Sequence, residues 1–206
     1  ASDRGIVVES LYGPREPYRR EIDFNRPRFC SIGGVRENAG LDLVVRALAG
    51  LKARGVAAVL DVAGKIVSED VRNAVESAAA EAGVSGQVRF HGYVETPEMA
   101  AMLERCVCGL ALFTGGRQNY SNWGLSGKIK EYLENGVPPI VCEENTLAQE
   151  LKDRQAGFAV KESAGELENV LFRLCTDREL CETYSRNAHA LACEKTSPAE
   201  LYAAIE

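Results

Sequence analysis

Apolar residues occur along the chain in two patterns: short runs that are almost wholly apolar, and longer runs with apolar residues three or four positions apart. The short runs predict strands buried on both sides, and the longer ones predict helices that bury a single face. The two kinds of run follow one another in turn, which is typical of a parallel sheet covered by helices on both faces. We therefore expect an α/β fold, a Rossmann-like three-layer α/β/α sandwich with a mostly parallel sheet of about six strands.

The expected elements can be placed by their ranges. The predicted strands are 28–34, 57–64, 87–94, 107–113, 137–144 and 157–162, and the predicted helices are 40–55, 68–83, 96–106, 126–136, about 164–175 and 177–195. Ser68 and Thr96 are expected to cap the second and third helices, with Pro97 at the first helical position of the third. Gly83 and Gly136 are expected to end the second and fourth helices.

The beginning of the chain has a different composition. Residues 1–27 include "LYGPREPYRREIDFNRP", which is rich in Pro, Arg and Glu and predicts a linker that packs on the rest of the protein. Residues 28–206 are then one Rossmann-like domain, a length sufficient for a sizeable core. No internal repeat is evident.

Charge and cysteine content exclude several classes of function. The net charge of −6 is scattered, and no basic stripe indicates nucleic acid binding. The longest apolar runs, such as "CGLALF", are far shorter than a membrane span, and the first residues do not resemble a signal peptide, so we expect a cytoplasmic protein. The seven cysteines are irregularly spaced and are expected to be reduced. With only His91 and His189 to join them, no metal site is predicted.

The long connection and helix start at 113–131 carry the strongest chemical signal. In parallel α/β sheets, ligands bind beyond the carboxyl ends of the strands. Here the amides of Ser126, Gly127 and Lys128 begin a helix, where free N–H groups favour an anion. The positive charge of Lys128 opposes the helix dipole unless a phosphate neutralises it. Glu131 shares the same helix face and could accept hydrogen bonds from ribose hydroxyls, although a solvated Lys128–Glu131 pair is the alternative.

Three other features are less specific. Gly33 and Gly34 follow the first strand and either admit a ligand to the backbone or form a tight turn. They are not part of a G-x-G-x-x-G fingerprint, which argues against hydride chemistry. His91 is expected to be a satisfied histidine at a strand end. Trp123 is expected to anchor its loop, with stacking on a ligand as the alternative.

Several longer stretches carry a resemblance to a known family. They include "FCSIGGVRENAGLDLVVRALAGL", "VLDVAGKIVSEDVRNAVE" and "LSGKIKEYLENGVPPIV", of which the last is close to the pattern S-x-K-x-x-E-Y-x-x-x-G-x-P-V-I. In register over nearly the whole chain, the sequence resembles the C-terminal, nucleotide-sugar-binding domain of GT-B glycosyltransferases, specifically the group 1 (family 4) retaining enzymes.

The resemblance implies roles for individual residues. Glu131 matches the second glutamate of the family's E-x7-E motif, which holds the ribose. The other implied contacts are with the diphosphate (Leu125, Ser126, Gly127, Lys128), the approach to the phosphates (Gly33, Gly34), the base (Tyr93, Val94) and, less directly, the donor sugar (Asn122, Trp123). No cofactor and no metal are implied. The catalytic histidine of the family lies in an N-terminal acceptor domain without a counterpart here, so no catalytic residue is assigned, and any peripheral membrane contact would be made through that domain.

The sequence also departs from the family at three positions. Trp123 stands where the family often has a glutamate that contacts the donor sugar, and Gly34 and Ala39 stand where it usually has an arginine and a lysine. Lys128, with Arg117 or Lys65, would have to compensate for these two missing cations.

Three functions follow. The first is the donor-binding domain of a glycosyltransferase of polysaccharide or glycoconjugate biosynthesis, which transfers a sugar from a nucleotide diphosphate-sugar to an acceptor and is inactive without its acceptor domain. The second is a non-catalytic binding or interaction module with a degenerate donor site. The third is another GT-B relative, such as a nucleotide-sugar epimerase, or a generic Rossmann-like nucleotide binder.

Overall fold

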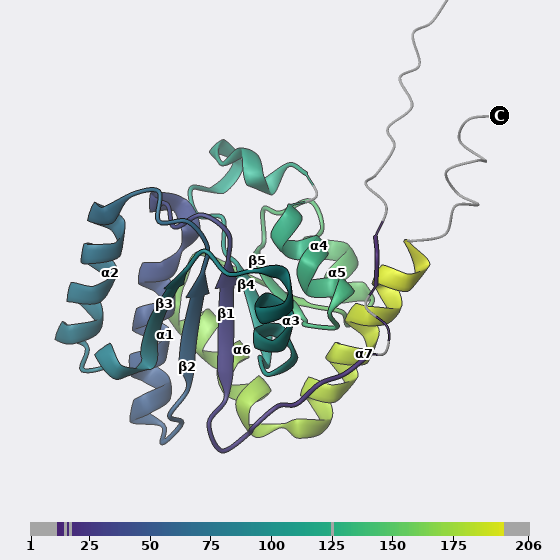
Figure 1. The fold of residues 1–206 in the computed structure, drawn as a ribbon, viewed down its shortest axis with the longest axis horizontal. Coiled ribbons are helices and arrows are strands. Elements are labelled where there is room, and N and C mark those ends of the chain that lie inside the picture. Colours follow the sequence, from purple (N-terminus) through teal and green to yellow (C-terminus); the bar gives the residue numbers. More distant parts are fainter. Residues whose placement is uncertain (1–11, 15, 17, 125, 196–206) are drawn as a thin grey trace, which may run out of the picture.

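A single parallel sheet forms the centre of the protein. The computed structural model describes residues 12–14, 16, 18–124 and 126–195 (Figure 1). All strand pairs are parallel, and the spatial order is β3-β2-β1-β4-β5-β6. The strands are β1 (Arg28–Ile32), β2 (Val59–Ala63), β3 (Val88–Gly92), β4 (Cys108–Ala111), β5 (Pro139–Cys142) and β6 (Phe158–Val160). The predicted six-stranded parallel sheet is confirmed.

Helices cover both faces of this sheet, which gives the three layers expected. On one face, apolar residues of α1 (Leu41–Ala53), α2 (Glu69–Glu81) and α6 (Ala164–Thr176) share a core with the sheet. On the other face, residues of α3 (Thr96–Glu104), α4 (Gly127–Glu134), α5 (Ala148–Asp153) and α7 (Arg178–Glu194) form a second core. Figure 1 shows α3 passing in front of the strands.

The order in which strands are added to the sheet changes direction at its middle. From β1 the chain proceeds outward to β2 and β3, and then returns through α3 to place β4 on the other side of β1. The β1/β4 boundary is therefore the topological switch point, where diverging loops leave a crevice at the carboxyl ends of the strands. The fold thus predicts a ligand site next to the loops that follow β1 and β4.

A buried tyrosine fixes α4 against this boundary. The hydroxyl of Tyr132 accepts a hydrogen bond from the Ile32 amide at 3.0 Å and lies 3.2 Å from the carbonyl oxygens of Cys30 and Leu110. Its ring packs directly on Gly109, where any side chain would overlap the ring atoms. These contacts hold the start of α4 in a defined position relative to the end of β1.

The element boundaries include one confirmed cap, one wrong cap and one missed helix. Ser68 caps α2, since its side-chain oxygen accepts from the Val71 amide at 3.3 Å. The prediction that Thr96 caps α3 is wrong: Glu95 holds the cap position and Thr96 is the first helical residue. The short helix α5 was not predicted, because it has only six residues and no side-chain cap.

The described part of residues 1–27 contains no helix or strand, and it lies against the domain. The guanidinium group of Arg20 donates to the carbonyl oxygens of Leu103 (2.7 Å) and Cys106, and the Glu21 amide donates to the Glu104 carbonyl at 2.8 Å. The segment therefore satisfies backbone groups at the carboxyl end of α3. The domain boundary between residues 27 and 28 stays a prediction, with β1 beginning at Arg28.

Candidate functional site at the switch point

A pocket of about 490 Å³ opens at the switch point. Three segments surround it: the end of β1, the connection from β3 into α3, and the start of α4. Its lining residues are Ile32, Gly33, Val94, Thr96, Met99, Ser126, Gly127, Lys128 and Glu131. Six of these nine were predicted from the sequence, and they come from three separate parts of the chain.

Two glycines pack together where β1 and β2 end, and one of them, Gly33, lines the pocket. Gly33 has a φ of 92°, a conformation that favours glycine, and its amide donates to the Ala63 carbonyl at 2.8 Å. Gly64, with a φ of 145°, packs so closely on Gly33 that a β-carbon there would lie 2.0 Å from the Gly33 carbonyl oxygen. A β-carbon on Gly33 would in turn approach the Lys128 side chain at 3.1 Å. The missing side chains therefore leave room for Lys128 and for a ligand.

The start of α4 presents a positive end to the pocket. Ser126 is the N-cap, and its side-chain oxygen accepts from the Lys128 amide at 3.3 Å. Among the described residues the Gly127 amide has no hydrogen-bond partner, as expected for the first residue of a helix. A free amide and the helix dipole at this position both favour a bound anion.

Lys128 adds a partly buried cation to this helix end. Burial is the main cause that lowers the pKa of Lys128 to about 8, and the nearby charge of Arg36 makes a smaller contribution in the same direction. Its ammonium nitrogen lies 5.6 Å from the centre of the Phe113 ring, and it makes no ion pair with any described residue. A phosphate in the pocket would supply the missing counter-charge and raise this pKa again.

The alternative of a solvated Lys128–Glu131 pair is not observed. In the described chain no ion pair joins Lys128 to Glu131, whereas the expected pair forms between the partly buried Lys130 and Glu134 at 3.4 Å. The side-chain amide of Asn135 donates to the Glu131 carbonyl at 2.8 Å and reaches its carboxylate only at 3.5 Å. The Glu131 carboxylate therefore lines the pocket with most of its hydrogen-bonding capacity available.

Other predicted site residues are not brought to the pocket. Gly34 and Tyr93 do not line it, and the Tyr93 side chain is 77% exposed. Asn122 is fully buried and donates to the carbonyl oxygens of Phe113 (2.8 Å) and Gly116 (2.9 Å), so it holds its own loop together. Leu125 lies outside the described residues.

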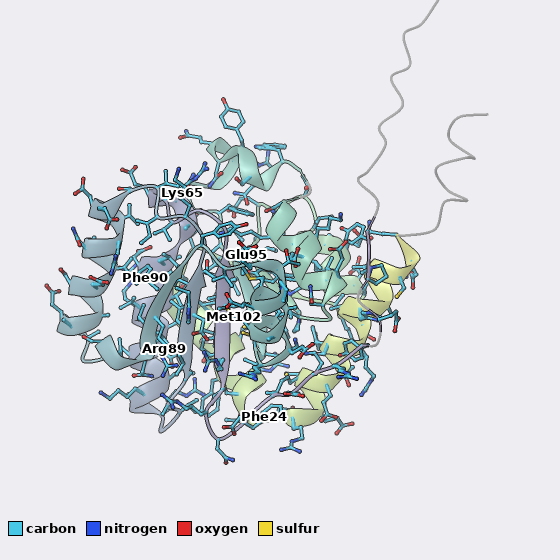
Figure 2. The ribbon with its side chains drawn as sticks, in the orientation of Figure 1. Phe24, Lys65, Arg89, Phe90, Glu95 and Met102 are labelled. Carbon is cyan, nitrogen blue, oxygen red and sulfur yellow. The ribbon has the colours of Figure 1, made fainter. Side chains whose placement is uncertain are left out.

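Trp123 and the two possible compensating cations also stay outside the lining. The indole N–H of Trp123 donates to the Arg117 carbonyl at 2.7 Å, which agrees with an anchoring role, although the side chain is 56% exposed. Lys65 lies at the carboxyl edge of the sheet (Figure 2) but, like Arg117, does not line the pocket. Lys128 is the one cationic side chain in the lining of this pocket as the structure describes it.

Three lining residues were missed by the sequence reasoning. Ile32, Thr96 and Met99 complete the pocket between β1 and α3. The sequence does mark Thr96 as part of a helix start, because a threonine precedes Pro97. The same pattern also predicts a helix cap, and it does not indicate that the side chain faces a pocket. Ile32 and Met99 are ordinary apolar residues, and only the tertiary fold reveals that they face a cavity.

The strand-end histidine has a structural partner, as expected. His91 Nε2 lies 2.7 Å from an oxygen of Asp61, which is fully buried, and Arg28 donates to the other oxygen at 2.8 Å. The buried carboxylate is therefore compensated by two basic groups from neighbouring strands. None of the three residues lines the pocket.

The remaining candidates lie elsewhere in the fold. All seven cysteines are free thiols, and only Cys193 is exposed. One group of possible metal ligands, Glu16, His189 and Cys193, is found among the described residues, and none of them lines the pocket. A second cavity of about 470 Å³ lies between the N-terminal segment and α7 and contains none of the predicted site residues. Within the described range, no helix is long and apolar enough to cross a membrane.

Comparison with known families decides the relationship. A family model for glycosyl transferases group 1 matches residues 14–191, which is most of the chain. The chain belongs to this family. The resemblance to the C-terminal domain of GT-B group 1 glycosyltransferases is thereby confirmed.

Solved structures of group 1 and related glycosyltransferases have the same fold. The C-terminal domain of a group 1 family protein (LpcC) from Francisella tularensis is 17% identical, with a TM-score of 0.69 over 90% of this chain and 95% of that chain. Anabaena Alr3699/HepE, in complex with UDP and glucose, is 16% identical, with a TM-score of 0.72 over 88% of this chain and 47% of that chain. WaaG, a glycosyltransferase involved in lipopolysaccharide biosynthesis, is 18% identical, with a TM-score of 0.71 over 94% of this chain and 54% of that chain.

This glycosyltransferase domain thus spans about half of the HepE and WaaG chains and nearly all of the LpcC domain. Among curated proteins, none matches the chain.

Proposed function

We propose that this chain is the donor-binding domain of a glycosyltransferase that transfers a sugar from a nucleotide diphosphate-sugar to an acceptor. The observation that carries the proposal is the pocket itself, in which Gly33, the start of α4, Lys128 and Glu131 converge. The HepE complexes, one with UDP and glucose and another with UDP-glucose, support a donor of this class. We infer a hexosyltransferase-like, retaining reaction from the family resemblance.

The proposed arrangement divides the donor among the elements of the pocket. The diphosphate lies between Gly33 and the start of α4, where the Gly127 amide and the Lys128 ammonium group contact it. The ribose hydroxyls donate to Glu131, one turn further along the helix, and the base lies near Val94. As the bond to the sugar breaks, negative charge builds on the diphosphate, and these same groups stabilise it. Such a site needs no resident metal or cofactor.

Titration calorimetry with UDP, GDP and ADP tests this proposal. We expect at least one of the three to bind, and Glu131→Gln to weaken that binding by about 10-fold or more, because a charge-assisted hydrogen bond is replaced by a neutral one. Glu98→Gln is the matched control, since Glu98 is an exposed acid in the first turn of α3 outside the pocket lining. If no nucleotide binds at millimolar concentration, the proposal fails.

A non-catalytic module with a degenerate donor site is the second candidate. It is favoured by the three departures at Gly34, Ala39 and Trp123, and by the single cation in the pocket lining. The two candidates differ in the complete protein that contains this chain. Glu131→Ala should abolish most sugar transfer if the pocket holds the donor, whereas unchanged transfer would favour the non-catalytic module.

A further inference from the structure

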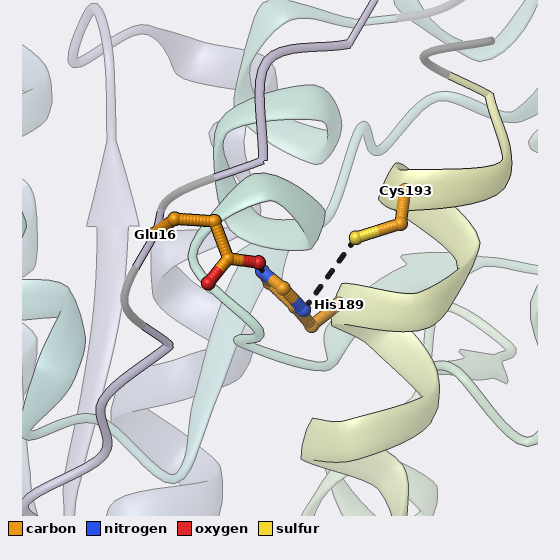
Figure 3. A group of neighbouring side chains, drawn as sticks. All are labelled: Glu16, His189 and Cys193. Atoms are coloured by element: carbon orange, nitrogen blue, oxygen red, sulfur yellow. Dashed lines mark hydrogen bonds and ion pairs between the residues drawn. The ribbon is translucent and has the colours of Figure 1, made fainter.

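Three potential metal ligands meet where the N-terminal segment crosses α7. Figure 3 shows Glu16 from the segment beside His189 and Cys193, which lie one turn apart on the helix. The Cys193 sulfur is 3.7 Å from His189 Nδ1, and a Glu16 carboxylate oxygen is 3.8 Å from His189 Nε2. One ligand atom from each residue lies within 4.8 Å of the others.

The geometry suits a tetrahedral ion. Zinc bonds of about 2.0–2.3 Å to nitrogen, oxygen and sulfur place neighbouring ligand atoms roughly 3.3–3.7 Å apart. The Cys193 sulfur is already 3.7 Å from His189 Nδ1. The Glu16 oxygen is 3.8 Å from the other ring nitrogen, Nε2, so the exposed Glu16 side chain has to move closer to Nδ1 to complete the site. The spacing of His189 and Cys193, four residues apart, puts both on one helix face and makes them a preformed chelating pair.

The histidine is already oriented. Its side chain is only 12% exposed, and its ring packs against the Tyr18 ring with centroids 4.7 Å apart. Nδ1 faces the cysteine, so this nitrogen is the one positioned to share an ion with the sulfur. A ring held in place by packing loses little conformational freedom when it binds a metal.

We propose that Glu16, His189 and Cys193 bind a divalent cation of the zinc class, with water as the fourth ligand, and that the ion fastens the N-terminal segment to α7. A mixture of sulfur, imidazole and carboxylate ligands favours zinc over magnesium or calcium. Binding replaces the Cys193 thiol proton with the metal, and the proton leaves to solvent without any redox change. The ion is independent of the proposed donor pocket, which none of the three residues lines.

Cobalt(II) titration of the whole chain, prepared without a histidine tag, tests the proposal. We expect one equivalent of Co²⁺ to give a thiolate-to-cobalt charge-transfer band, which added Zn²⁺ abolishes. Cys193→Ser should eliminate the band, and Glu16→Gln should weaken cobalt binding by about 10-fold. His91→Gln is the control, because it removes the other histidine of the chain and should leave the band unchanged.

A second measurement tests whether the ion fastens the N-terminal segment to α7. Arg19 is exposed within the fastened segment. Zinc at about ten times its dissociation constant should slow trypsin cleavage after Arg19 by about 10-fold in the parent chain, and have no effect in Cys193→Ser. Cys193 is exposed, so this variant is expected to fold. Absence of the band in the parent chain, or its persistence in Cys193→Ser, would overturn the proposal.

Discussion

Lys128 is unfavourably placed in the free protein, and the proposed diphosphate would compensate for this. A lysine in the first turn of a helix opposes the helix dipole, and here it is also largely removed from water. Burial lowers its pKa to about 8, so its charged form is destabilised in the unliganded pocket. A diphosphate would remove both penalties, and its binding should therefore depend on the protonation of this one residue.

This dependence predicts a pH profile for nucleotide binding. A bound diphosphate restores the Lys128 pKa toward the ordinary lysine value, so binding takes up a proton once the pH exceeds about 8. Affinity should be highest below pH 8 and fall by about 10-fold between pH 7 and pH 9. Titration calorimetry at several pH values between 7 and 9 measures this change in nucleotide affinity.

Two variants separate Lys128 from other causes. Lys128→Met should bind nucleotide weakly and with little pH dependence. Lys130→Met, which removes the neighbouring lysine paired with Glu134, should keep the parent profile. An equal pH slope in all three proteins would contradict the role given to Lys128.

Helical spacing explains why some site residues could be predicted and others could not. Ser126, Gly127, Lys128 and Glu131 belong to one helix start, where spacing alone decides which side chains share a face. Asn122 belongs to the loop before it, which folds into two short 3-10 turns, η3 (Gly116–Gln118) and η4 (Tyr120–Asn122). The hydrogen bonds of Asn122 turn its side chain inward, and no local periodicity reports such a loop conformation.

Most strands could be predicted as elements because they are largely apolar runs bounded by glycine or polar residues, whereas β3 alternates with the polar Arg89 and His91. The turns that follow β1, β2 and β3 pack on one another at the carboxyl edge of the sheet, next to the pocket. The Gly33 amide donates to the Ala63 carbonyl, and the Gly64 amide donates to the Gly92 carbonyl at 2.6 Å. The sequence shows these glycines after their strands, but their mutual packing depends on which strands are neighbours in the sheet.

The stacked turns predict that Gly64→Ala damages both stability and the pocket. Its φ of 145° and the 2.0 Å approach to the Gly33 carbonyl oxygen would force the two turns apart. We expect a loss of about 2–4 kcal/mol in the free energy of unfolding, measured with urea, together with weaker nucleotide binding.

Gly86→Ala is the matched control for this change. Gly86 lies in the 3-10 turn η2 (Ser85–Gln87), and a β-carbon there would have no atom within 4 Å. Its substitution should alter the free energy of unfolding by no more than about 0.5 kcal/mol. Equal urea midpoints for the two variants would show that the packing of Gly64 on Gly33 is unimportant.

The strand order of the sheet decides where the pocket lies in the molecule. Alternating strands and helices could be recognised in the sequence, and the layered parallel architecture followed from them. The strand order could not, because it depends on where the β3–α3–β4 connection returns across the sheet. Once that order is known, the β1/β4 switch point coincides with the residues selected for their chemistry. The cytoplasmic location and the separate linker stay predictions.

The domain alone should bind nucleotide without transferring sugar. The chain spans about half of the HepE and WaaG structures, and the proposed donor pocket has groups for a departing diphosphate but no assigned catalytic residue. Incubation with UDP-, GDP- and ADP-glucose should release no nucleoside diphosphate above the uncatalysed background. Calorimetry on the same samples controls for folding. Nucleotide release that depends on chain concentration would contradict this expectation.

Amide NMR spectra, recorded during titration with the tightest-binding of UDP, GDP and ADP, show directly whether the pocket at the switch point holds the nucleotide diphosphate. If the pocket holds the diphosphate, the largest shift changes should occur at Gly33, Val94, Gly127 and Lys128, and Glu131→Gln should diminish them at equal nucleotide concentration. Shift changes centred on Tyr18, Arg20 and Ser185, which line the cavity beside α7, would contradict it.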